Sequence, residues 1–150
     1  MHQLSKAWYM GNEANLYLLN AIEDRYLGDR YTRNSRPVAA QFAHMHNFRL
    51  RWLSHAAPDL AEEVAQFPRG ASLSKEDLIQ ALYSSSEVMA VYLDRCEVSG
   101  EIESWDGPPA SFLAYVIAHE AHHRGLVMAA LHACGHQPPE EVIYGLWEWN

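Results

Sequence analysis

Apolar residues recur with the period of an α-helix, about 3.6 residues, in four long segments of the chain. The first segment runs from about Asn12 to Leu27 and ends beside Gly28, a residue that favours a helix terminus. The second runs from Pro37, which suits the first turn of a helix, to about Ala57, where Pro58 stops it. The first part of the chain therefore predicts two amphipathic helices.

The second part of the chain predicts two further helices with clear end signals. Ser74 precedes acidic residues and an apolar stripe, a pattern typical of an N-cap, and this helix extends toward Cys96. The last long helix runs from about Ala110 to Ala133. Gly135 stands at the C′ position after it, where a left-handed residue commonly ends a helix.

Strand signals are weak, because no run of alternating apolar and polar residues lies between hairpin turns. Four amphipathic helices favour an all-α fold, a four-helix bundle formed as a single domain over residues 1–150. The aromatic tail, Gln137–Asn150, is expected to pack back on this bundle. Cofactor and metal sites in such bundles form from side chains that point inward from facing helices.

Charge and cysteine content narrow the classes of partner. Eleven Lys and Arg against nineteen Asp and Glu give a net charge of −8, which argues against direct binding of nucleic acid or of an anionic membrane. The two cysteines, Cys96 and Cys134, cannot form a disulfide framework and suit a reducing compartment. The sequence shows no signal-peptide pattern and no apolar run of about 18 residues, so we expect a cytoplasmic protein.

The fourth helix carries a pair of histidines with the spacing of metal ligands. His119 and His123 lie four residues apart, so their Cβ atoms share one helical face at a separation of about 6 Å. That face continues through apolar residues such as Phe112 and Val127, so we expect it to point into the bundle. Two imidazoles at this spacing can reach one metal ion, and the alternative is a pair of hydrogen-bonded core histidines. His122, about 100° around the helix, is expected outside this site.

The second helix offers two candidates for a third ligand. His44 and His46 lie about 200° apart around the helix axis, so we expect only one of them to face the bundle interior. His46 shares a face with Leu50, and His44 shares a face with Phe48. The spacing leaves the choice between the two open.

Two segments carry a resemblance to a known family. The stretch Phe42–Leu53 and the signature HEAHHRG at His119–Gly125 resemble the DinB/YfiT family, which includes DNA-damage-inducible proteins and related metalloenzymes. The resemblance implies a four-helix bundle, a homodimer, and a divalent metal held by three histidines. By position in the motifs, the family's ligands fall on His44, His119 and His123.

The resemblance also implies a class of chemistry. Three imidazoles leave at least one position of a divalent ion open, as in catalytic sites. Zn²⁺ suits the ligands best, and Ni²⁺, Fe²⁺ or Mn²⁺ also accept imidazole. Characterised relatives are thiol-dependent, so we expect a small-molecule substrate and a low-molecular-weight thiol as partners. The expected reaction is S-transfer by an activated thiolate, and the other use of the same site is hydrolysis by an activated water. The alternative is a non-catalytic stress-response dimer in which the metal is structural.

Several polar residues are candidates for supporting roles. Glu120 is a candidate catalytic residue or a partner for a histidine N–H, and a solvated surface position is its other interpretation. Arg124 is a candidate for binding a substrate carboxylate or for pairing with an acidic residue across the bundle. Arg49 lies at the edge of an apolar stripe, so it requires a buried carboxylate if it points inward. Asn12 and Asn15 are interpreted either as residues at the mouth of the site or, preferably, as ordinary cap and surface residues.

Overall fold

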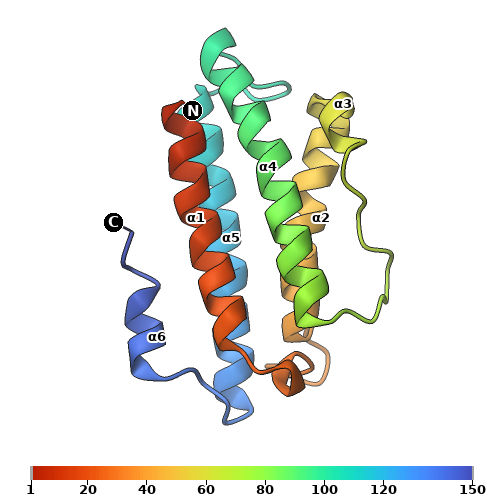
Figure 1. The fold of residues 1–150 in the computed structure, drawn as a ribbon, viewed down its shortest axis with the longest axis vertical. Coiled ribbons are helices and arrows are strands. Elements are labelled where there is room, and N and C mark those ends of the chain that lie inside the picture. The colour runs from red at the N-terminus through yellow and green to blue at the C-terminus, as the bar shows by residue number, and fades with distance from the viewer. Residues whose placement is uncertain (1, 150) are drawn as a thin grey trace.

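The computed structural model describes residues 2–149, so Met1 and Asn150 at the ends of the predicted domain lie outside the described residues. The fold is all-helical, as predicted, and no strand is present among the described residues (Figure 1). Four long helices form the bundle, and the shorter elements lie at its ends and side. The long helices are α1 (Gln3–Ala21), α2 (Val38–Ala56), α4 (Lys75–Ser99) and α5 (Pro109–Ala133). The shorter elements are the 3₁₀ helix η1 (Asp24–Tyr26), α3 (Pro58–Ala61) and α6 (Glu140–Gly145).

The order of the helices around the bundle differs from their order along the chain. Helices α1 and α2 each pack mainly on α4 and α5, so α1 and α2 lie diagonally across the bundle from one another. Figure 1 shows that α2 and α4 run in the same direction, so the chain must return along the whole bundle between them. Residues 57–74, which include α3, make this long return connection on the outside of the bundle.

The end signals read from the sequence form as predicted. The Ser74 hydroxyl accepts a hydrogen bond from the Asp77 backbone N–H, and the Asp77 carboxylate accepts one from the Ser74 N–H, which completes a capping box. At the end of α5, Gly135 has φ = 75°, in the left-handed region. The N–H groups of Gly135 and His136 donate to the carbonyls of His132 and Leu131, a Schellman motif that ends the helix.

The predicted bounds of the first helix were wrong at both ends. The helix begins at Gln3 rather than near Asn12, because its inward face starts with Ser5, Trp8 and Asn12, whose mixed polarity hides the periodicity. It ends at Ala21, and Ile22 has an extended backbone. Ile22 is nevertheless buried. Its side chain therefore packs into the core from the turn that follows the helix, which is why the apolar pattern continues past the helix end.

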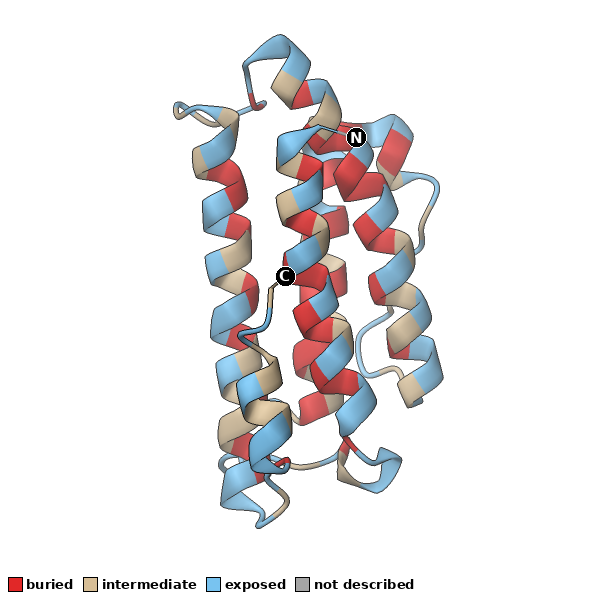
Figure 2. Ribbon diagram, turned by 60° about the vertical axis from the view of Figure 1, so that its left-hand side comes forward, coloured by how far each residue is buried: buried red, intermediate tan, exposed pale blue. Residues whose placement is uncertain are grey.

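The buried core consists of two apolar halves with a polar layer between them. Figure 2 shows the buried residues of the core on successive turns of the long helices. Trp8 and Phe112 belong to one half, and Leu18 and Phe42 belong to the other. Each of the four long helices contributes polar residues at the level where the halves meet. These buried polar residues are Asn12, Asn15, Arg49, Ser85, Ser86 and Glu120.

The C-terminal segment lies against α1, as expected for an aromatic tail. Trp149 is half-buried, and its indole N–H donates to the Leu146 carbonyl. Trp147, in contrast, is 81% exposed and does not pack on the body. Among residues 2–149, none of the helices has both the length and the apolar character needed to cross a membrane.

Candidate metal centre

Three histidines from two helices meet between α2 and α5. His44 comes from α2, and His119 and His123 come from consecutive turns of α5. One ring nitrogen of each residue lies within 4.8 Å of the corresponding nitrogens of the other two. The Nε2 atoms of His119 and His123 are 3.2 Å apart. Two ligands at about 2.05 Å from a tetrahedral zinc ion are about 3.3 Å apart, so this group could hold a metal ion.

Neighbouring side chains orient the imidazole rings. The Nδ1 atom of His123 lies 2.7 Å from Oε1 of the buried Gln41. The amide oxygen accepts a hydrogen bond from Nδ1–H, which leaves a lone pair on Nε2. The Phe48 ring stacks on the His119 ring at a centroid separation of 4.0 Å. Gln41 was not predicted from the sequence. Its position three residues before His44 on the same helix places both on one face and could have indicated it.

The environment keeps the three rings neutral. Burial is the first cause that lowers the pKa of each: to about 4 for His44, to about 3 for His123, and to below the usual value for His119. The neighbouring histidines lower the pKa of His123 further, and the positive charge of Arg36 adds to the effect on His44. At neutral pH each ring therefore keeps a lone pair available for a cation.

The structure brings His44, and not His46, to His119 and His123. His46 is nevertheless fully buried, with Nδ1 3.0 Å from the Ala81 carbonyl and Nε2 2.9 Å from the Ala65 carbonyl. The sequence predicted that only one of these two rings would face the bundle interior, whereas each of them meets a neighbouring part of the fold. Helix α2 is covered on two sides, by α5 on the side of His44 and by α4 with the return connection on the side of His46.

Directly behind the histidines, Arg49 and Glu120 form an ion pair in the polar layer of the core. Arg49 is 0% exposed and Glu120 is 2% exposed. The Nε and Nη2 groups of Arg49 donate to the two carboxylate oxygens at 2.8 and 2.7 Å. The remaining N–H groups donate to the Leu82 carbonyl, the Ser85 hydroxyl and Asn12 Oδ1. The predicted buried carboxylate for Arg49 is thus Glu120, and the surface interpretation of Glu120 was wrong.

The other supporting candidates belong to the same network. Asn15 donates to Glu120 Oε1 at 2.6 Å, and its own Oδ1 accepts a hydrogen bond from Arg124 Nη1 at 2.6 Å. Asn12 and Asn15 are both buried, so their interpretation as cap and surface residues was wrong. Among the described residues Glu120 makes no hydrogen bond to a histidine, and Arg124 bonds to an amide rather than to a carboxylate. His122 is exposed, as predicted.

A groove with a volume of about 870 Å³ runs along the outer face of α2 and reaches His44. Its floor is the α2 face that carries Ala40, Ala43 and Asn47, and its far wall is the end of the return connection, residues 66–73. Arg36 and Arg51 also line it. The three-histidine group therefore adjoins a space large enough for a small molecule.

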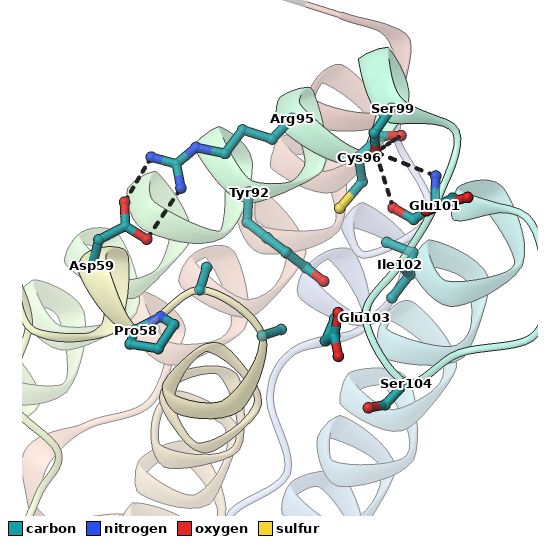
Figure 3. Close-up of a pocket in the computed structure, with 12 residues that line it drawn as sticks. Pro58, Asp59, Tyr92, Arg95, Cys96, Ser99, Glu101, Ile102, Glu103 and Ser104 are labelled. Carbon is teal, nitrogen blue, oxygen red and sulfur yellow. Dashed lines mark hydrogen bonds and ion pairs between the residues drawn. The ribbon is translucent and has the colours of Figure 1, made fainter.

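A second hollow, of about 430 Å³, lies near the other end of the bundle and offers no activated group (Figure 3). Arg95 and Asp59 pair across its edge through two hydrogen bonds of 3.2 and 2.8 Å. Burial raises the pKa of the Cys96 thiol and raises the pKa of Tyr92 to about 12, so both stay protonated. Cys96 is buried and Cys134 is exposed, and both are free thiols.

These observations define a helical bundle with a three-histidine centre that could hold a metal between two antiparallel helices. Comparison with family models assigns the chain more closely. The model described as the DinB family matches residues 1–149, and the chain belongs to that family. A search of curated proteins found no match to this sequence.

Proposed function

We propose that the protein is a divalent-metal-dependent enzyme in which His44, His119 and His123 hold the ion. Zinc is the metal that three imidazole ligands favour. The observation that carries this proposal is the set of three neutral imidazoles whose ligand atoms lie within 4.8 Å of one another beside an accessible groove. Membership of the DinB family supports it. A divalent ion held by three imidazoles lowers the pKa of a thiol or water that reaches it.

The reaction we propose is transfer to the sulfur of a low-molecular-weight thiol, with hydrolysis as the other use of the same centre. The residues of the chain contribute binding and orientation. Gln41 holds the His123 ring by accepting a hydrogen bond from its Nδ1–H group, and Phe48 covers one face of His119. The groove along α2 admits a small molecule to the side of the centre that His44 lines.

One feature favours a catalytic over a structural role for the ion. Helices α2 and α5 are already joined by protein contacts at this level, through the Arg49–Glu120 ion pair and the Gln41–His123 hydrogen bond. The buried core continues above and below. These contacts join the two helices without a metal, which supports a catalytic role for the ion.

Metal content of the purified protein tests the proposal. We expect about one equivalent of metal per chain by elemental mass spectrometry, lost in His44→Ala and His119→Ala and retained in His122→Ala, an exposed control on the same helix. The His119→Ala variant, which carries no metal, should keep its far-ultraviolet circular dichroism and melt within a few degrees of the metal-loaded parent. A loss of well over ten degrees would instead support a structural ion.

The thiol part of the proposal has a separate test. Protein reconstituted with Co²⁺ should show a new sulfur-to-metal charge-transfer band when a simple thiol such as cysteine is added. Binding of metal without any spectral change on addition of thiol would leave hydrolysis as the favoured reaction.

The homodimer stays a prediction, which sedimentation equilibrium can check.

A further inference from the structure

The groove beside His44 concentrates positive charge in a strongly acidic chain. The chain has a net charge of −8, with eleven Lys and Arg. Among residues 2–149, four of these eleven line this one groove, and no Asp or Glu lines it. The four are Arg30, Arg36, Arg51 and Arg69. They come from three separate segments: the chain before α2, α2 itself, and the return connection. Folding therefore gathers positive charge into a surface that attracts anions, although the net charge of the chain is negative.

The guanidinium groups in the groove are not neutralised by the protein. Among the described residues, Arg36, Arg51 and Arg69 form no ion pair, and Arg30 donates only to the Ser35 carbonyl. Among the described residues outside the groove, Lys6, Arg33 and Arg124 also form no ion pair, whereas the other four basic side chains find acidic partners. Those pairs are Arg25 with Glu23, Lys75 with Asp24, Arg95 with Asp59, and Arg49 with Glu120. The contrast indicates that the groove arginines are available to a ligand.

The positive charge is placed beside the three-histidine centre. His44 lines the groove, so a ligand in the groove lies next to that centre. Arg36 and Arg51 line the same groove as His44, from the chain before α2 and from α2 itself. A ligand held by these arginines is thus within reach of the proposed site of reaction.

The walls of the groove are held in place. Asn47 on α2 donates to the Phe67 carbonyl at 3.0 Å and accepts from the Phe67 N–H at 2.9 Å. His46 bonds to the Ala65 carbonyl, two residues before Phe67. Two adjacent side chains of α2 therefore fasten the return connection that carries Arg69. A groove with fixed walls loses little entropy when a ligand binds.

We infer that the groove binds a small-molecule anion, with a carboxylate or phosphate held by Arg36 and Arg51 and the remainder directed to the three-histidine centre. Guanidinium groups match both kinds of anion through paired N–H donors. A small molecule is favoured over a nucleic acid for two reasons. The return connection closes one side of the groove, and the negative charge of the rest of the chain repels a polyanion. This inference rests on the proposed function and specifies its substrate class.

Titration with two simple anions tests the inference on metal-free protein. Succinate and inorganic phosphate are added at constant ionic strength, kept with sodium chloride, and binding is followed by isothermal titration calorimetry. We expect saturable binding of at least one anion, weakened tenfold or more in Arg36→Gln/Arg51→Gln. Arg33→Gln, a nearby arginine that does not line the groove, should bind like the parent. Preference for succinate or phosphate identifies the anionic group.

Failure of this inference can be told apart from failure of the proposed function. Elemental analysis of the same double variant should still give the metal content of the parent, because neither arginine is a proposed ligand. Normal metal content with no saturable anion binding, or with equal affinity in the parent and the double variant, would overturn the anion site alone. Anion binding that depends on Arg36 and Arg51 in a protein that takes up no metal would support the groove and refute the metalloenzyme.

Discussion

Replacing Arg49 tests the interpretation that a buried ion pair holds the centre of the bundle together. Arg49→Met removes five hydrogen bonds and leaves the Glu120 carboxylate, 2% exposed, with only the Asn15 amide as a donor. Removing one partner of a buried pair costs about 3–5 kcal/mol, since the remaining charge is buried without compensation. A domain of this size loses about 2–4 °C in Tm for each kcal/mol, so we expect a drop of about 6–20 °C.

The assay is urea denaturation followed by circular dichroism, because it gives a free energy of unfolding for each variant. Arg95→Met is the matched control, since it breaks the exposed pair with Asp59 and should change stability by less than about 1 kcal/mol. The double variant Arg49→Met/Glu120→Leu removes both charges. We expect it to recover at least half of the loss, because apolar replacement of a buried pair is often neutral or stabilising.

Two outcomes would refute the reasoning about this pair. One is an Arg49→Met variant within about 1 kcal/mol of the parent, which would mean that water or a rearrangement compensates Glu120. The other is a double variant whose loss of stability equals the sum of the losses in Arg49→Met and Glu120→Leu measured singly, because independent sites are additive and paired charges are not. Either result would show that the polar layer is not organised around this ion pair.

Two further predictions follow from the histidine group. Gln41→Leu conserves volume but removes the acceptor that orients His123, so it should weaken metal affinity by about 10–100-fold. Competition with a chromophoric chelator measures the affinity, and an unchanged value would show that Gln41 does not orient the ligand. The metal-free protein should lose stability as pH falls below about 6.5, because the unfolded histidines take up protons that the folded His44 and His123, with pKa values of about 4 and 3, do not. Each of these residues changes the free energy of unfolding by at most about 1.4 kcal/mol per pH unit, and the partly exposed His44 changes it by less. Above pH 7 these histidines should make stability independent of pH. Urea denaturation at pH 7.5, 5.5 and 4.5 checks this, and stability that rises toward acid would contradict it.

Local features of the sequence determined the number of long helices, some of their ends, and the pairing of two of the three histidines. The ends of α4 and α5 follow from the capping residue Ser74 and from Gly135, because caps act within a single turn of chain. His119 and His123 share a face through helix geometry alone, so their pairing needed no knowledge of neighbouring helices. The family motifs placed the third position at His44, where the structure also brings a ring to the pair.

Relations between helices were decided only by the tertiary structure. The period of α2 could not separate His44 from His46, because the long return connection covers the side of the helix that would otherwise face solvent. Arg49 finds Glu120 seventy-one positions away along the chain, and no local pattern specifies such a pairing. The arginine groove likewise joins segments that the sequence separates. Spacing along one helix sets which side chains share a face, whereas the order of helices around the bundle sets what that face meets.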